Sequence, residues 1–178
     1  MKFFSQLVSF VPVVVLSAVG AMAQSSDTVI TAIEAFTATS SALGSTVDGL
    51  NILNFAISGF EIAQGLGNIT TAVTSFNAEF SSITPVYTDP VAVEVVNVLT
   101  TFVVVHQQLL NIIIGKHSLA AQFFLTAPIA AALRALEAVV DVFAFDLIAL
   151  IPTQSGPAMT QISALNVTFT ECLTTYSS

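Results

Sequence analysis

Charged residues are scarce in this sequence, and several other special residue types are rare. Lys and Arg total 3 and Asp and Glu total 11 among 178 residues, so that charged residues make up 8% of the chain, against about a quarter in an ordinary soluble domain. So few cations cannot neutralise a phosphate backbone, which excludes a nucleic-acid-binding protein. A single Cys excludes a disulfide framework and a zinc site built on cysteines.

Hydrophobic residues, in contrast, make up 54% of the chain. That much apolar surface is incompatible with an intrinsically disordered protein. The composition therefore leaves a membrane protein or a soluble domain with a very apolar interior, and the length favours one domain.

The N-terminal segment has the pattern of a secretory signal peptide. Lys2 supplies the positive start, Val13–Leu16 ends a short apolar run, and Ala21–Ala23 is a small-residue cleavage site. The run is too short for a retained membrane anchor. We therefore predict a signal peptide at 1–23 and one secreted domain at 24–178.

Two Asn-X-Thr sequons begin at Asn68 and Asn166. In a secreted chain such asparagines accept N-linked glycans. We predict glycosylation at both positions, and a mature protein that begins at Gln24.

A second apolar stretch, residues 95–115, contains no Asp, Glu, Lys or Arg. Polar residues nevertheless recur along one side of this helix, at Glu94, Asn97, Gln108 and Asn111 among others. Lipid offers no partners for such a stripe. The pattern therefore predicts a core helix of a soluble bundle and not an integral membrane protein.

Five runs of apolar residues return every three to four positions, as one face of a helix does. The runs cover Val29–Leu50, Ile62–Ile83, Val91–Ile112, Ile129–Leu150 and Met159–Tyr176. In the third run the predicted core positions are Val91, Val95, Val98, Phe102, Val105, Leu109 and Ile112. Alternation with period two, the pattern of a half-buried strand, is largely missing.

Prolines and glycines separate the runs, notably Gly49, Pro90, Gly115 and Pro152, with Gly156 and Pro157 beyond the last of these. A short apolar piece, Ser118–Leu125, lies between the third and fourth runs. We therefore predict an all-α, up-and-down bundle of five long helices plus one short helix. Short connections favour antiparallel neighbours, with the third helix at the centre.

Three segments give the chain a resemblance to a known family. They are Leu43–Val47, Asn111–Leu119 and Asp146–Pro152. With the signal peptide and the helical domain, the chain resembles the fungal hydrophobic surface binding protein A family, which includes cell-wall galactomannoproteins. The resemblance implies a non-enzymatic protein, extracellular or in the cell wall, that adsorbs to hydrophobic surfaces. Some relatives hold fatty acids within the bundle, and some help a polyester hydrolase reach its substrate.

The residues themselves also argue against an enzyme. The chain has no nucleophile elbow, no zinc-protease helix motif and no phosphate-binding glycine loop. His106 and His117 are eleven residues apart, which suggests no metal site. We predict no catalytic residue, no metal and no cofactor.

The apolar surplus suggests a ligand between the helices, because a large empty void loses packing contacts. The candidate apolar lining is Phe76, Phe80, Val98, Phe102, Val105, Leu109, Phe123, Phe124 and Phe143. The candidate polar groups at the mouth are Ser40, His106, Gln107 and Gln108. Ordinary core packing is the alternative for the phenylalanines, which we expect to lie in the middle of helices.

The predicted function is therefore binding of a hydrophobic ligand, with a long-chain fatty acid or similar amphiphile as the favoured partner. Two alternatives stay open. One is adsorption to hydrophobic solid surfaces with recruitment of a secreted hydrolase. The other is a passive glycosylated cell-wall component.

Overall fold

The chain folds into a helical bundle. The computed structural model describes residues 26–80 and 86–177, and the predicted signal peptide lies outside these ranges. The five long helices are α1 (Ser26–Asp48), α3 (Glu61–Phe80), α4 (Asp89–Gly115), α6 (Thr126–Leu150) and α7 (Ser155–Ser177). Shorter elements are α2 (Phe55–Ser58), α5 (His117–Gln122) and the 3₁₀ turn η1 (Pro152–Gln154).

The all-α prediction is confirmed, and within the described ranges there is no strand. The predicted short helix is α5, which begins one residue earlier and ends three residues earlier than expected. Helix α2 was not predicted. It is a single turn, which is too short to produce a recurring apolar face.

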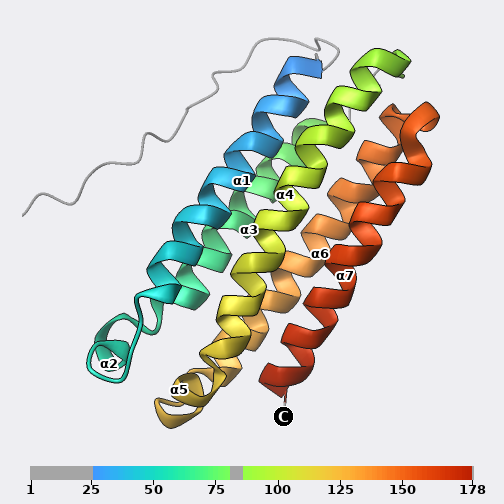
Figure 1. The fold of residues 1–178 in the computed structure, drawn as a ribbon. Helices are drawn as coiled ribbons and strands as arrows, with labels where there is room; N and C mark the ends of the chain where they lie inside the picture. The colour runs from blue at the N-terminus through green and yellow to red at the C-terminus, as the bar shows by residue number, and fades with distance from the viewer. Residues whose placement is uncertain (1–25, 81–85, 178) are drawn as a thin grey trace, which may run out of the picture.

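The long helices form two layers, and each long helix reverses the direction of the previous one (Figure 1). Helices α1, α4 and α7 run in one direction and lie side by side, with α4 in the middle, while α3 and α6 run in the other direction behind them (Figure 1). The closest packing joins α1 with α4, α3 with α6, and α4 with α7. The up-and-down prediction is confirmed, since successive long helices run in opposite directions, but the closest packing joins helices of the same direction (Figure 1). Successive helices alternate between layers, which leaves helices of the same direction adjacent within each layer.

The helix ends follow from proline and glycine chemistry. Pro90 lies in the first turn of α4, where its missing N–H costs no hydrogen bond. Gly156 and Pro157 do not separate the last two helices as predicted, because α7 already begins at Ser155. Pro157 therefore occupies a first-turn position of the same kind as Pro90.

The predicted apolar faces of α1, α3 and α6 are the buried faces. In α1 the buried residues are Val29, Ile33, Phe36, Ser40, Leu43, Gly44 and Val47, and Gly44 is the only addition to the predicted run. Helix α7 departs at its start, where Ala158 is buried and Met159 is exposed.

Helix α4 buries three of the seven predicted positions, Val95, Phe102 and Leu109, and neighbouring positions take the place of the other four. Val91, Val98, Val105 and Ile112 are only half buried, and Ala92, Leu99, His106 and Ile113 are buried. Because α4 has a neighbour on each side, its buried arc is wide and centred one position away from the predicted stripe.

The outer face of α4 carries the predicted polar stripe. Glu94, Asn97, Thr101, Gln108 and Asn111 are all exposed. By length and composition alone, α4 is the one helix in the described ranges that could cross a membrane.

Candidate functional site

A hydrogen-bonded polar pair lies inside the bundle. Ser40 of α1 and His106 of α4 are both fully buried, and the Ser40 Oγ lies 2.9 Å from the His106 Nδ1. With Thr168 they are the only polar side chains buried in the part of the chain that the structure describes. Both were predicted at the mouth of a cavity, but burial places them in the core.

Aromatic rings surround the imidazole of His106. The ring centroids of Phe102 and Phe169 lie 5.2 and 5.5 Å from it. Burial lowers the pKa of His106 to about 4, so the side chain is neutral at pH 7. Its Nε2 atom has no hydrogen-bond partner.

Two tautomers of the neutral imidazole are compatible with the Ser40–His106 contact, and they reverse the direction of its hydrogen bond. If Ser40 donated to Nδ1, Nε2 would be a buried N–H donor without an acceptor, and orphaned buried N–H groups are rare. If instead Nδ1–H donates to the Ser40 Oγ, Nε2 is a bare acceptor and the hydroxyl proton of Ser40 is the group that needs an acceptor. This tautomer leaves the hydroxyl proton of Ser40 free to be donated elsewhere.

An open groove follows the contact between α1 and α4 and passes over this pair. It consists of two hollows, of about 400 Å³ and about 190 Å³, which meet at Ser41 and Val105. The α1 lining is Glu34, Thr37, Ala38, Ser40, Ser41, Gly44, Ser45 and Asp48, and the α4 lining is Val98, Thr101, Val105, Gln108, Leu109 and Ile112. We call this feature the α1–α4 groove; it spans about 21 Å along α1 at 1.5 Å per residue.

The two hollows differ in chemistry. The larger one has Ala38, Val98 and Val105 in its lining. The smaller one is lined by Ser40, Ser41, Ser45, Asp48 and Gln108 together with Gly44, Val105, Leu109 and Ile112. Ser40 lies beneath its surface with no exposed area. Both hollows combine apolar side chains with hydroxyl groups and one carboxylate, which is Glu34 in the larger hollow and Asp48 in the smaller one, and the smaller hollow has the greater share of hydroxyl and amide groups.

Five of the ligand-binding residues predicted from the sequence line this groove, namely Ser40, Val98, Val105, Gln108 and Leu109. The prediction missed the small residues of α1. Ala38, Ser41, Gly44 and Ser45 recur along α1 beside the predicted apolar stripe, and that spacing was the available signal. Small side chains leave space between two closely packed helices, which creates the groove.

Gln107 points to the other neighbour of α4. Its Nε2 donates to the Ala164 carbonyl oxygen and to the Thr168 Oγ1 at 2.9 and 3.0 Å. Both acceptors belong to α7, so Gln107 joins α4 to α7 and lies away from the groove.

Most of the predicted phenylalanine lining is packed against other side chains of the core. Phe36, Phe76, Phe80 and Phe143 form a cluster of edge-to-face contacts with centroids 5.0 to 6.1 Å apart. Such contacts stabilise a core beyond the area that they bury. The expected position in the middle of a helix is wrong for Phe80, which ends α3.

Phe123 and Phe124 are also not in the middle of a helix, because they follow α5 directly. Phe123 stacks on Phe55, with the ring centroids 5.6 Å apart. Phe124 is 89% exposed and cannot line the interior. The apolar run at 118–125 contains no turn signal. The end of α5 within it therefore could not be predicted from the sequence.

The remaining reactive groups offer no comparable site. Cys172 is free and buried, and burial raises its thiol pKa to about 12, so the thiolate that would act as a nucleophile is not formed at pH 7. No three His, Cys, Asp or Glu side chains gather as a metal site would need, within residues 26–80 and 86–177. Of the two sequon asparagines, Asn68 is exposed on α3 and Asn166 is half buried on α7.

Folding stability is expected to depend on His106 between about pH 6.5 and pH 4. The unfolded chain binds a proton at this histidine below its ordinary pKa of about 6.5, whereas the folded chain binds one only below about 4. Stability should therefore fall as the pH drops through this window, by about 3 kcal/mol in total. Urea unfolding at pH 7.0 and pH 4.5 measures the loss.

The double variant Ser40→Ala/His106→Leu is the control, because replacing both partners by apolar groups leaves no orphaned atom. The part of the stability loss at low pH that comes from protonation of His106 should be absent in this variant. The part that comes from the exposed carboxylates should remain. An equal loss of stability in the wild type and the double variant would contradict the assignment to His106.

Comparison with known proteins gives a likeness of fold. No family model matches the chain, and no curated protein matches its sequence. Among solved structures, AFMP4P in complex with palmitic acid superimposes with a TM-score of 0.75. The match covers 85% of this chain and 99% of that chain at 12% sequence identity. The two chains share their fold.

Proposed function

We propose that this protein binds one long-chain fatty acid between α1 and α4, with its carboxyl group at Ser40 and its acyl chain along the α1–α4 groove. The observation that carries the proposal is the Ser40–His106 pair beneath this groove. His106 is a positioning residue, because its Nδ1–H occupies the Ser40 oxygen and leaves the hydroxyl proton for the ligand. The palmitic acid in AFMP4P supports the same ligand class for a chain of this fold.

The size and lining of the groove also support an amphiphile. Its larger hollow, at about 400 Å³, falls within the range of about 300–1,000 Å³ that is usual for small-molecule sites. Apolar side chains in both hollows and the greater share of hydroxyl and amide groups in the smaller one match a long chain with a single polar head. No substrate-transforming chemistry follows from this arrangement, and the proposed role is binding or transport.

The proposal also covers the location of the protein outside the cell. A secreted, non-enzymatic protein of the extracellular space or cell wall would meet free fatty acids released by secreted hydrolases, and the resemblance to the hydrophobic surface binding protein A family supports this setting. Glycosylation at Asn68, which is exposed, is compatible with it.

A titration of delipidated protein with a fluorescent fatty acid, followed by displacement with palmitic acid, tests the proposal. The wild type should saturate at one ligand per chain. Ala38→Phe should weaken binding at least about tenfold, because an added ring fills the larger hollow. Ala35→Phe is the matched control on an exposed position of the same helix outside the groove and should bind normally.

The double variant Ser40→Ala/His106→Leu separates binding from folding. It removes the head-group donor without leaving a buried polar atom unpaired, so it should fold and still lose affinity. Non-saturating uptake that ignores both groove variants would contradict a site between α1 and α4 and favour adsorption to any hydrophobic surface.

A further inference from the structure

One end of the bundle exposes a group of large apolar side chains. Ile57 lies in α2, Ile52, Leu53 and Phe60 flank that helix, and Phe124 follows α5; all five are more than half exposed, with Leu53 at 89% and Ile57 at 77%. Helices α2 and α5 lie at the same end of the bundle (Figure 1). We call these five residues the apolar tip. Isolated exposed apolar residues are ordinary, whereas a cluster marks an interaction surface.

Specific contacts hold the two halves of the tip together. The ring of Phe55, which is fully buried, stacks on Phe123 between them. The Lys116 Nζ donates to the carbonyl oxygens of Asp48 and Leu50 at 2.9 and 2.8 Å. The loop around α2 is therefore tied to the start of α5, and the tip is presented as one surface.

The backbone at Phe124 is strained in a way that presents its ring to solvent. Its φ angle is +57°, the only positive value at a non-glycine residue in the described chain. Bulky residues rarely adopt this conformation, which costs roughly a factor of ten in conformational equilibrium. The strained backbone therefore belongs to a residue whose ring does not pack inside the protein.

Several backbone amides of the tip donate hydrogen bonds within the protein. Asn51 and Asn54 act as acceptors for the amides of Leu53 and Asn51 at 2.9 and 2.7 Å. The Phe124 and Leu125 amides donate to the carbonyl oxygens of Ala121 and Ala120. A medium that supplies no hydrogen bonds would leave none of these groups orphaned, and this is the condition that lipid imposes.

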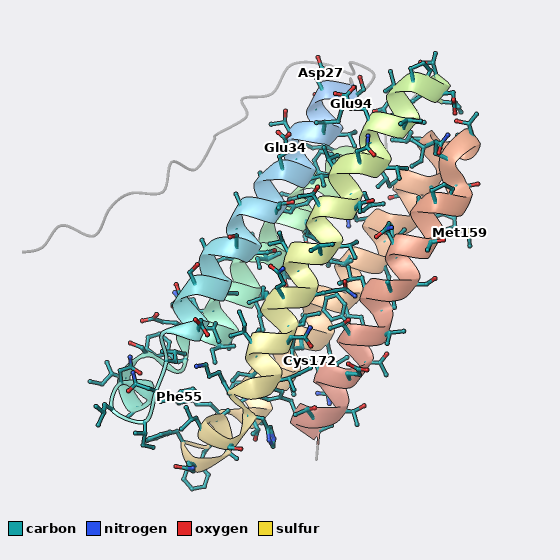
Figure 2. All side chains as sticks on the ribbon, viewed as in Figure 1. Asp27, Glu34, Phe55, Glu94, Met159 and Cys172 are labelled. Carbon is teal, nitrogen blue, oxygen red and sulfur yellow. The ribbon has the colours of Figure 1, made fainter. Side chains whose placement is uncertain are left out.

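The scarcity of charged residues around the apolar tip favours a lipid surface over a charged partner. Residues 49–60 and 117–133 contain no Asp, Glu, Lys or Arg, and the charged residues that border them are Asp48, Glu61, Lys116 and Arg134. Asp27, Glu34 and Glu94 lie toward the opposite end of the bundle from Phe55 (Figure 2). With a formal charge of −8, the chain is repelled by an anionic surface, while its uncharged tip can approach a neutral one.

We propose that the apolar tip inserts into the surface of an uncharged lipid layer, such as a phosphatidylcholine bilayer, while the bundle stays folded. The site uses residues other than those of the α1–α4 groove, so that either proposal can fail without the other.

Flotation of the purified full chain with phosphatidylcholine vesicles tests the proposal. The wild type should float with the vesicles and keep its helical circular dichroism spectrum. Leu53→Ser/Ile57→Ser and Phe124→Gly should each lower the partition coefficient between vesicles and water, by about tenfold for each large side chain removed. Phe124→Gly should fold at least as well as the wild type, because glycine adopts a positive φ without strain.

Phe145→Ser is the matched control, since Phe145 is also 77% exposed but lies on α6. It should bind vesicles like the wild type. A wild-type chain that stays in solution overturns the proposal, as does equal flotation of all variants. Binding that requires anionic lipid, or a dimer formed through the tip without vesicle binding, overturns it as well. Binding with loss of helicity would indicate spreading of an opened bundle and also overturns it.

Discussion

Phe102→Asp is expected to leave the chain without a cooperative unfolding transition at pH 7. Phe102 is 2% exposed and packs on the His106 ring. Truncating such a side chain alone costs about 3 to 5 kcal/mol, and a buried carboxylate adds an unpaired charge. The free energy of unfolding of a domain of this size is about 5 to 15 kcal/mol. The substitution therefore removes most or all of the folding stability. Circular dichroism and urea unfolding measure the result.

Val98→Asp is the matched control on the same helix. Both positions belong to the apolar run read from the sequence, but Val98 is half buried and lines the open α1–α4 groove. Its carboxylate can reach water, so the cost should be about 1 kcal/mol and the chain should fold. Equal unfolding of the two variants would show that the buried arc of α4 is not the one described.

Fatty-acid affinity is expected to weaken about tenfold for each unit of pH above the ordinary carboxyl pKa of about 4.3, or about a hundredfold between pH 5.5 and pH 7.5. No cation is buried in the described part of the chain. Lys116 bonds to backbone carbonyls and Arg134 to the Ser177 hydroxyl. Asp48 lines the same hollow as Ser40 and repels an anion. The head group should therefore enter as the neutral acid, with uptake of one proton.

A long-chain alcohol is the control for this pH dependence, because it has the same chain and no titratable head. Its dissociation constant should stay constant over the same pH range. A fatty-acid dissociation constant that is equally constant would mean that the carboxylate remains in water, and would remove Ser40 from the head-group site.

The sequence predicts the buried face of a helix well when that helix has one interior side. Helices α3 and α6 bury Ile62, Leu66, Leu133 and Leu136, and the other described members of their stripes, at the predicted positions. Helix α4 is apolar on most sides, so two stripes offset by one residue fit its sequence equally well. Only the packing of α1 and α7 against it selects the buried set.

The candidate site is predictable in its residues and not in its geometry. Ser40 stands out as the one polar residue in an apolar stripe, and His106 as a histidine on an apolar helix. Their contact joins positions 66 residues apart, which no local pattern encodes. The exposed position of Phe124 is likewise not predictable from the sequence. The direction of its side chain depends on one backbone angle and not on residue type.

A crystal structure of the protein grown with palmitic acid tests whether the fatty acid binds between α1 and α4. We expect density for one acyl chain between α1 and α4, along Ala38, Val98 and Val105. One carboxyl oxygen should lie about 2.5 to 3.0 Å from the Ser40 Oγ, with the Nδ1–H of His106 still directed at that oxygen. An acyl chain between α6 and α7, or one whose carboxyl group does not contact Ser40, would contradict this binding mode.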